Sequence, residues 1–506
     1  MIYMVADDPA HGELLDQQAN RELDQIIYSA LAADKDEHKV KVAVQLDFRN
    51  RPDVWRRVIG QGGWAQPESA AADPATLYGF FDFVANACPA DRYALILWGH
   101  SRGPFGLFTD RPFSSPMAGP FAQDSEQTYI AQTLTLKELR VALRTARESL
   151  NQRVDIIAFK DCFMSTLETA YELEDSADYI IASPQIVPIE GWPYREIFTA
   201  LAANPEDPEK ASRGLVKALK DHYSHKANRH GLKDVPFTLM STGKLTNVNQ
   251  PLRSLVTALV PAIEKRGTTI RNALRGAKRA DSALLDVSDL CRRLKERGDK
   301  QLGRAADELH AAIGHVVLNP ERKAKQTSAR SKKGGRQLRQ ATFGGVSVFC
   351  YPFEKGLQRT SLIARLASRG VYGTLAIANT NWQSIAIREM PDDPVPPVTY
   401  HNASYPASEP DSDARALLRQ VLAQIPRGLL EELARKGDGF SKELGFSKEL
   451  GFSKELGFSK ELGFSKELGF ATELQFKREV EDPREVAAFF KLLGLEDRRR
   501  RRRKKR

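Results

Sequence analysis

The first half of the chain alternates short apolar runs, rich in β-branched residues, with longer stretches in which apolar residues recur every three or four positions. The short runs predict strands and the longer stretches predict amphipathic helices. We expect strands at residues 2–5, 40–46, 93–98, 155–159 and 179–182, and helices at 19–33, 74–87, 136–150 and 165–174. Because these strands are apolar almost throughout, both faces of their sheet must be covered. The pattern predicts an α/β fold with a mostly parallel sheet and helices on both faces.

The pattern changes after residue 208, where helical periodicity dominates as far as residue 319 and is broken by one short strand at 236–240. A basic, glycine-containing stretch at 321–340 is expected to form an exposed loop. A buried strand at 345–351 and a last helix at 372–387 then complete the core, which we place at residues 1–390.

A low-complexity extension follows the core. It consists of a Pro-rich linker at 391–411, a helical segment at 412–438, hexapeptide repeats at 439–474, and a short helix with an Arg/Lys tail at 475–506. The repeat is GFSKEL, with five perfect copies and one variant. Six residues advance an ideal helix by about 600°, so the Phe side chains would not form one stripe. An extended chain places Phe and Leu on one face, so the repeat fits either an adhesive strand or a disordered tract.

The formal charge of +10 comes mostly from the last nine residues, which are all Arg or Lys. We expect this tail to bind polyanions only nonspecifically, because it lacks the interleaved aromatic residues that stack on bases. No apolar stretch reaches the roughly 20 residues that a membrane-spanning helix needs.

The cysteine pattern bears on the compartment and on metals. The four cysteines are widely spaced and form no C-x-x-C pair, which excludes a thiolate zinc cluster and fits a reducing compartment. With no basic segment leading into an apolar run at the N-terminus, we expect a cytoplasmic protein. His222, His225 and His230 lie close in sequence but lack the H-E-x-x-H pattern, so no metal site is predicted.

Two of the predicted strands end in reactive side chains. The segment DRYALILWGH ends at His100, and the segment DIIAFKDC ends at Cys162. Because parallel strands present their carboxyl ends at one edge of a sheet, His100 and Cys162 are expected to meet there. An imidazole beside a thiol makes it a nucleophile near neutral pH, and Cys162 is also expected to open a helix whose dipole favours the thiolate.

The sequence motifs around these residues resemble those of the clostripain family of cysteine peptidases, relatives of caspases, legumains and gingipains. The resemblance covers roughly residues 1–390 and is carried by IYMVADD at 2–8, DRYALILWGH at 91–100, FKDCFM at 159–164, LETAYEL at 167–173, ADYIIAS at 177–183, GWPY at 191–194, LDVSDL at 285–290 and GVSVF at 345–349. It implies a caspase-like fold, a protein or peptide substrate, Cys162 as nucleophile and His100 as general acid and base. It also implies an oxyanion hole made by backbone amides at Ser101 and Cys162. No cofactor is required, and calcium enters only as a family implication.

Two positions depart from the family's pattern. The family usually has Gly directly after the catalytic His, where this chain has Ser101, and an acid two residues before the Cys, where this chain has Lys160. Strand alternation places Lys160 on the same side as Cys162, so we expect it to repel basic substrates and to alter the family's Arg/Lys preference. Asp161 and Glu190 are the other candidates for the substrate pocket.

Two alternatives stay open. Residues 99–103 read GHSRG, the G-x-S-x-G pattern of a serine hydrolase with Ser101 as nucleophile, although that elbow should lead straight into a helix and Pro104 and Pro112 follow here. A catalytically inactive binding or scaffold protein with the same fold is the other alternative, motivated by Ser101, Lys160 and the repeats.

Overall fold

The computed structural model describes residues 1–7, 12–34, 40–48, 53–67, 71–110, 132–189, 191–226, 235–281, 283–318, 343–351, 369–390, 399–400 and 403–404. The chain divides into two units, Met1–Ala407 and Ser408–Arg506. The basic loop expected at 321–340, the helical segment, the repeats and the tail all lie outside the described residues, as does nearly all of the linker. No helix of the described part is long and apolar enough to cross a membrane.

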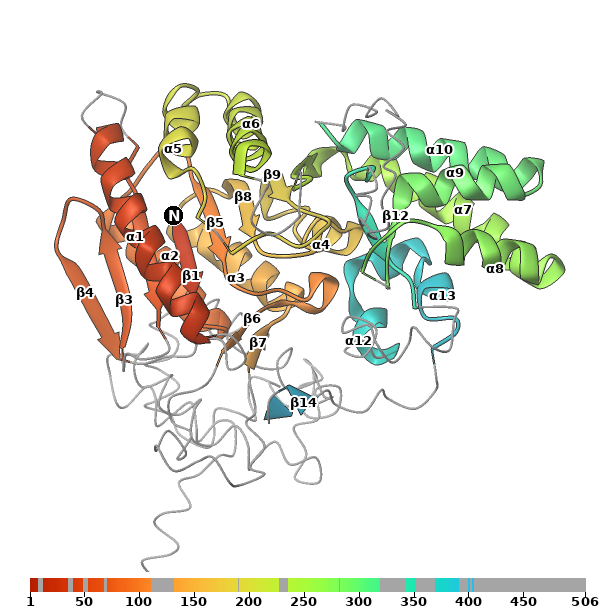
Figure 1. The fold of residues 1–506 in the computed structure, drawn as a ribbon, viewed down its shortest axis with the longest axis horizontal. Coiled ribbons are helices and arrows are strands. Elements are labelled where there is room, and N and C mark those ends of the chain that lie inside the picture. Colours follow the sequence, from red (N-terminus) through yellow and green to blue (C-terminus); the bar gives the residue numbers. More distant parts are fainter. Residues whose placement is uncertain are drawn as a thin grey trace, which may run out of the picture. The chain divides into compact units, whose positions relative to one another are not determined.

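The centre of the first unit is an eight-stranded sheet in the order β10-β9-β8-β5-β1-β2-β3-β4 (Figure 1). The five middle strands pair in parallel, and antiparallel strands are added at both edges. The strands are β1 (Ile2–Val5), β2 (Ala43–Asp47), β3 (Asp53–Val58), β4 (Gly63–Pro67), β5 (Ala94–Trp98), β8 (Val154–Lys160), β9 (Ala177–Ala182) and β10 (Thr238–Ser241). The mostly parallel α/β sheet is therefore confirmed, and all five strands expected in the first half belong to it.

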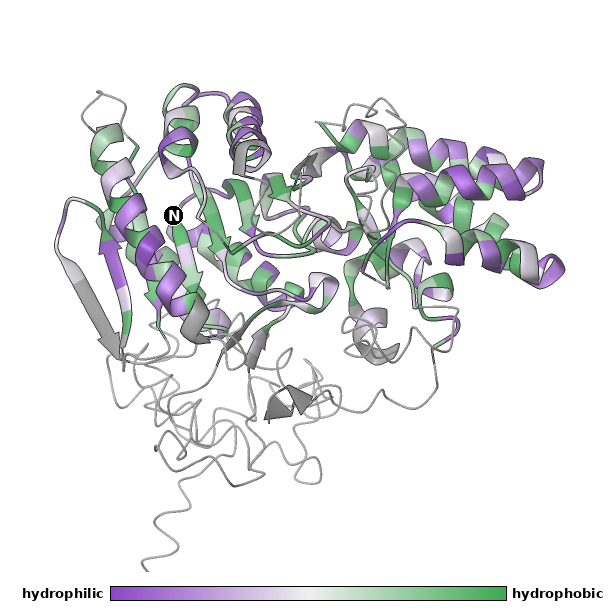
Figure 2. Ribbon diagram, viewed as in Figure 1, coloured by the Kyte–Doolittle hydropathy of each residue, from purple (hydrophilic) through white to green (hydrophobic). Residues whose placement is uncertain are grey.

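Helices cover both faces of this sheet. One face packs on α1 (Gly12–Asp34), α5 (Tyr194–Ala202) and α6 (Pro208–Lys226), and the other on α2 (Pro74–Ala87), α3 (Leu136–Ser149) and α4 (Leu167–Glu172). Strand β8 shows the consequence, because all seven of its residues are buried. Ile156 and Ala158 contact the first layer, whereas Ile157 and Phe159 contact the second. Hydrophobic residues accordingly concentrate on the central strands (Figure 2).

Local signals in the sequence fix where two of these helices begin. Asp73 caps α2 through the amide of Ala75, and Pro74 supplies a preset backbone angle at the first helical position. Thr135 and Glu138 form a reciprocal capping box at the start of α3. Both helices begin where the apolar periodicity predicts them.

The second half forms a helical lobe beside a small sheet. Its helices are α7 (Thr246–Lys265), α8 (Gly267–Gly276), α9 (Val287–Arg297) and α10 (Lys300–Val316), and its sheet is β11 (Arg279–Asp281), β12 (Leu284–Asp286) and β13 (Ser347–Phe349). The expected strand at 345–351 thus pairs with β12 rather than joining the main sheet. Shorter elements are η1 (Gly103–Phe105), β6 (Leu107–Asp110), β7 (Gln132–Leu134), η3 (Thr242–Lys244), β14 (Thr399–Tyr400) and β15 (Ala403–Ser404).

The single helix expected at 372–387 is wrong. The segment is broken into α12 (Arg369–Thr374), η5 (Ala376–Thr380) and α13 (Gln383–Ala386). Asn381 ends η5 in the left-handed conformation, which an uninterrupted α-helix does not allow.

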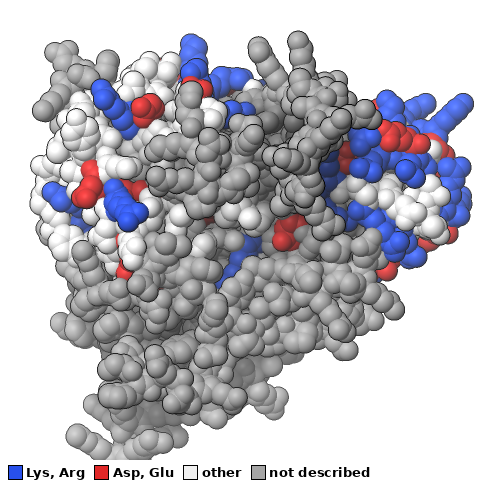
Figure 3. Space-filling view, in the orientation of Figure 1, with Lys and Arg blue, Asp and Glu red and all other residues white. Residues whose placement is uncertain are grey.

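Lys and Arg side chains gather on the helical lobe (Figure 3). Several of them pair with carboxylates, as Arg292 does with Glu296 and Lys295 with Asp307. Exposed pairs of this kind contribute little to stability. We read this face as a solvated surface.

A buried carboxylate on α4, which packs on the main sheet, joins this helix to β13 and α12 from the second half of the chain. Glu168, on α4, is fully buried, and one of its oxygens accepts hydrogen bonds from the Phe349 amide at 2.9 Å and the Tyr372 hydroxyl at 2.6 Å. Burial raises the pKa of Glu168, and these two donors oppose the rise. One acceptor thus links three segments, and its loss would leave two buried donors without this partner, which is costly.

Replacing Glu168 with Ala should lower the free energy of unfolding by about 3 kcal/mol, because two buried donors lose their acceptor. The control Tyr372→Phe removes one donor and leaves the Phe349 bond, so it should cost only about 1 kcal/mol. Urea denaturation followed by circular dichroism measures both. Equal stability of Glu168→Ala and the wild type would show that the carboxylate does not join these segments.

Candidate active site

The register between β5 and β8 sets the geometry of the candidate site. The two strands are parallel neighbours, and Trp98 lies opposite Lys160 at the last pair of the ladder. His100 and Cys162 each follow two residues later, at the carboxyl edge of the sheet. The two residues expected to meet therefore leave adjacent strands at matching positions.

A tight loop holds the His100 side of the site. The Phe108 amide donates to the His100 carbonyl at 2.7 Å, the Arg102 amide donates to the Gly106 carbonyl at 2.8 Å, and Ser101 forms a β-bridge with Leu107. A Cβ at Gly99 would come within 2.7 Å of the Phe108 ring, so this position requires glycine. The loop is thus closed on itself directly after the strand.

The two strand-end loops also contact each other. The Ser101 hydroxyl donates a short hydrogen bond to the Cys162 carbonyl. Ser101, where the family usually has glycine, therefore ties the His100 loop to the Cys162 turn. Sequence reasoning found Ser101 but not this contact.

Cys162 lies in a turn that is also held by residues 185–187. Its Sγ accepts a hydrogen bond from the Val187 amide at 3.4 Å, and the next amide, of Phe163, donates to the Gln185 carbonyl at 3.2 Å. Phe163 has a φ of 59°, a conformation that is costly for a bulky residue and occurs mostly where the surroundings enforce it. The thiol is half-buried in this turn.

The expectation that Cys162 opens a helix is wrong. Helix α4 begins at Leu167 and is capped by the Thr166 hydroxyl. The helix dipole acts within the first turn, so it does not reach a thiol that lies five residues before the helix.

Electrostatics favour the neutral form of the thiol. Burial raises the pKa of Cys162 to about 11, the Val187 amide lowers it, nearby Asp161 raises it, and Lys160 lowers it slightly. A thiol of this kind is protonated at neutral pH, so its use as a nucleophile requires a base to accept the proton.

Asp161 is almost completely buried. Neither of its carboxylate oxygens has a hydrogen-bond partner of normal geometry among the described residues, although the Gly99 amide lies close enough to act on it electrostatically. Burial raises the pKa of Asp161 well above its usual value, which Lys160 and the Gly99 amide only partly oppose. Burial therefore favours the protonated form of Asp161.

Lys160 does not face solvent as a free cation. Its ammonium forms an ion pair with Glu22 of α1, with Nζ and Oε1 2.8 Å apart and side chains only 3% and 0% exposed. It also lies 4.7 Å from the centre of the Trp98 ring. The argument that Lys160 repels basic substrates loses its basis, because its charge is balanced inside the protein. Glu22 was missed because it is distant in sequence and reads as an ordinary helix position.

Two expected site residues remain, Ser101 as an alternative nucleophile and Glu190. The G-x-S-x-G elbow requires a strand, a turn and then a helix, whereas Ser101 is followed by the one-turn η1 and strand β6, so the geometry disfavours Ser101 as a nucleophile. Glu190 lies outside the described residues.

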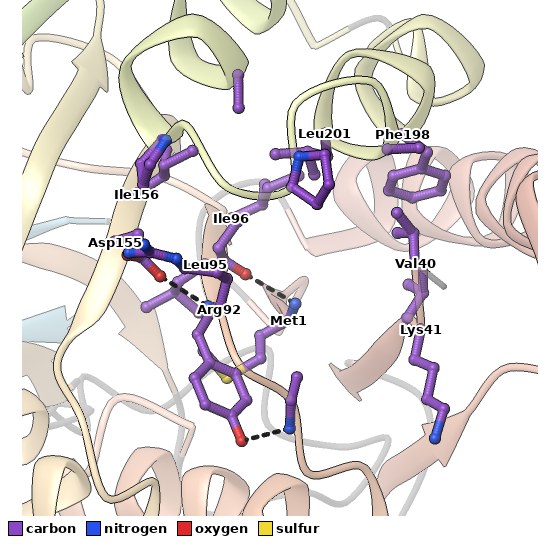
Figure 4. Close-up of a pocket in the computed structure, with 18 of the residues that line it drawn as sticks. Met1, Val40, Lys41, Arg92, Leu95, Ile96, Asp155, Ile156, Phe198 and Leu201 are labelled. Carbon is purple, nitrogen blue, oxygen red and sulfur yellow. Dashed lines mark hydrogen bonds and ion pairs between the residues drawn. The ribbon is translucent and has the colours of Figure 1, made fainter. Parts of the chain in front are cut away.

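A cavity of 550 Å³ lies elsewhere, where β1, β5 and β8 begin (Figure 4). Met1, Ile96 and Ile156 line it, together with the ion-paired Arg92 and Asp155. In parallel strands this is the edge opposite His100 and Cys162, so the cavity is not part of the candidate site. Within the described residues, no three His, Cys, Asp or Glu side chains are grouped so as to hold a metal ion.

The sequence comparisons both point to clostripain. The sequence pattern of the clostripain family matches residues 2–300. Clostripain from Hathewaya histolytica is 30% identical over 145 residues, which are 27% of this chain and 26% of that protein, so the match spans about a quarter of the curated relative.

One solved structure shows the same fold, and a second is less similar. A secreted C11 cysteine protease from Bacteroides thetaiotaomicron, in complex with an irreversible peptide inhibitor, is similar with a TM-score of 0.51 and 17% identity, over 76% of this chain and 98% of its own. An inactive zymogen C11 protease from Parabacteroides distasonis has a TM-score of 0.47 and 16% identity, over 75% of this chain and 96% of its own.

The environment of Cys162 predicts how its alkylation depends on pH. With the pKa of the thiol at about 11, the rate of reaction with iodoacetamide should still be rising at about pH 10, because only the thiolate reacts. Asp161→Asn should shift this profile to lower pH, because it removes a carboxylate that raises the pKa of the thiol. Peptide mapping by mass spectrometry would separate Cys162 from the other cysteines. A plateau below about pH 8 would contradict this electrostatic account.

Proposed function

The chain belongs to the clostripain family of cysteine peptidases, and on that premise we propose that it is an endopeptidase with Cys162 as nucleophile and His100 as general acid and base. The observation that supports the proposal most is the β5–β8 register, because it brings both residues to one edge of the sheet at matching positions. The Ser101 bond to the Cys162 carbonyl supports it further, because it joins the two loops.

The protonated state of the thiol defines the first step. Sγ attacks the carbonyl carbon of the scissile peptide bond while its proton moves to the His100 imidazole, and a sulfur–carbon bond forms. The backbone amides of Ser101 and Cys162 are the proposed donors to the oxyanion. The carbon–nitrogen bond then breaks, and His100 returns the proton to the leaving amine.

The second half of the reaction releases the acid. Water attacks the thioester, His100 accepts its proton, and the thiol regains a proton as the acyl group leaves. No third side chain is needed to carry a proton.

We also propose that the residue preceding the scissile bond is uncharged, a departure from Arg/Lys preference. Three features support this: Glu22 balances the charge of Lys160, burial raises the pKa of Asp161 and so favours its uncharged form, and the apolar Ile186 is 53% exposed one residue from the amide that contacts Sγ. A basic side chain therefore meets no strong attraction at these residues, and an acidic one meets none either.

Cleavage mapping of a diverse peptide mixture by mass spectrometry tests both proposals. Cys162→Ala should reduce cleavage by more than about a thousandfold, because the nucleophile is lost. Cys88→Ala, at a buried cysteine away from the site, should leave it intact. Ser101→Ala should slow cleavage without abolishing it.

The alternatives have distinct outcomes. Loss of cleavage in Ser101→Ala with retention in Cys162→Ala would assign a serine hydrolase. Absence of cleavage by the folded wild type, with or without calcium, would favour a scaffold. Cuts confined to positions after Arg or Lys would contradict the proposed preference while leaving the mechanism standing.

A further inference from the structure

Helix α1 is connected to the candidate site through a buried polar network. Glu22 accepts hydrogen bonds at Oε2 from the Trp98 indole at 3.1 Å and the Tyr194 hydroxyl at 2.5 Å, while Gln18 donates to Oε1 at 3.1 Å. The same Oε1 pairs with Lys160 at 2.8 Å. A buried carboxylate with this many partners has a fixed position, so it can in turn fix Lys160.

Lys160 makes one contact that reaches beyond this network. Its ammonium donates to the Ile189 carbonyl at 3.3 Å. Ile189 ends residues 185–189, which we call the wall segment. The ammonium therefore joins a helix at the start of the chain to the segment that touches the thiol.

The wall segment is attached at every second residue. Gln185 accepts from the Phe163 amide, Val187 donates to Sγ of Cys162, and Ile189 accepts from Lys160. The intervening Ile186 is 53% exposed. These three contacts hold the segment in place, and its exposed part at Ile186 forms an outward side that a peptide could contact.

We propose that the Glu22–Lys160 ion pair is a positioning device, which holds the wall segment against Cys162 so that the Val187 amide stays on Sγ and the outward side stays aligned for substrate. This inference rests on the proposed function. Lys160 acts through Ile189 and Val187 and touches no reacting atom, so it is a positioning residue and not a catalytic one.

Stability alone offers a rival explanation, because a buried ion pair that loses one partner destabilises the fold. A double variant separates the two. Lys160→Met removes the donor to Ile189 and leaves Glu22 buried without its cation. Lys160→Met combined with Glu22→Gln removes both charges, which should restore part of the stability that Lys160→Met loses but cannot restore the donor to Ile189.

The test measures thermal stability, kcat and KM for a cleaved peptide, and the alkylation rate of Cys162, for both variants and for Lys160→Arg. We expect the double variant to melt at a higher temperature than Lys160→Met, to keep a KM above that of the wild type, and to react with iodoacetamide about tenfold more slowly than the wild type at pH 8. The slower reaction follows from the weakened Val187 contact and the lost positive charge, both of which lower the pKa of the thiol in the wild type. Lys160→Arg, which keeps a charged donor, should recover most of the KM.

The control is Lys217→Met, at an exposed lysine of α6 that pairs with Asp221. It removes an ion pair without contacting the wall segment and should leave KM and the alkylation rate unchanged. Recovery of KM and alkylation together with stability in the double variant would overturn the inference. If the wild type cleaves no peptide, alkylation still tests the positioning role, so failure of the inference and failure of the proposed function are distinguishable.

Discussion

The parallel pairing of β5 with β8 is the constraint on which the candidate site depends. Their last paired residues are Trp98 and Lys160, and the two chemically reactive residues each follow at the same interval. A shift of one residue would exchange the side chains of β8 between its two helical layers and move Cys162 out of register with His100. Because all seven residues of β8 are buried between two helical layers, such a shift is strongly disfavoured.

At the carboxyl edge of the sheet, the ionisable side chains next to Cys162 are buried. Lys160 is neutralised by Glu22, and burial raises the pKa of both Asp161 and Cys162. Ion pairing and burial thus both oppose a free charge beside Cys162. This favours a mechanism in which the proton leaves the thiol during attack, because burial disfavours a preformed thiolate. It also favours substrate selection by shape and apolar contact.

The sequence predicted the main sheet well because strand runs such as 93–98 and 155–159 are apolar on both faces, a pattern that few other structures share. It missed the edge hairpin β3–β4, where Arg56 and Arg57 interrupt the apolar pattern of an edge strand. It predicted a strand at 345–351 without its partner, since the pairing with β12 is set by tertiary packing.

For the site, strand ends and strand alternation predict His100, Cys162 and the side on which Lys160 points, and these assignments stay predictions. The sequence could not indicate Glu22 or the wall segment. Glu22 lies 138 positions before Lys160, and no local pattern distinguishes it from a solvent-exposed helical glutamate. The helix expected to begin at Cys162 was also wrong. Phe163 has a left-handed backbone conformation, and α4 begins only at Leu167.

The central claim is that the β5–β8 register brings His100 and Cys162 within reach of each other. Reaction with 1,3-dibromoacetone, whose three-carbon chain can bridge a thiol and an imidazole, tests this directly when the products are mapped by tandem mass spectrometry. The account predicts a covalent bridge between Cys162 and His100 that disappears in the His100→Ala variant. Alkylation of Cys162 alone, with no link to His100 in the folded wild type, would contradict it.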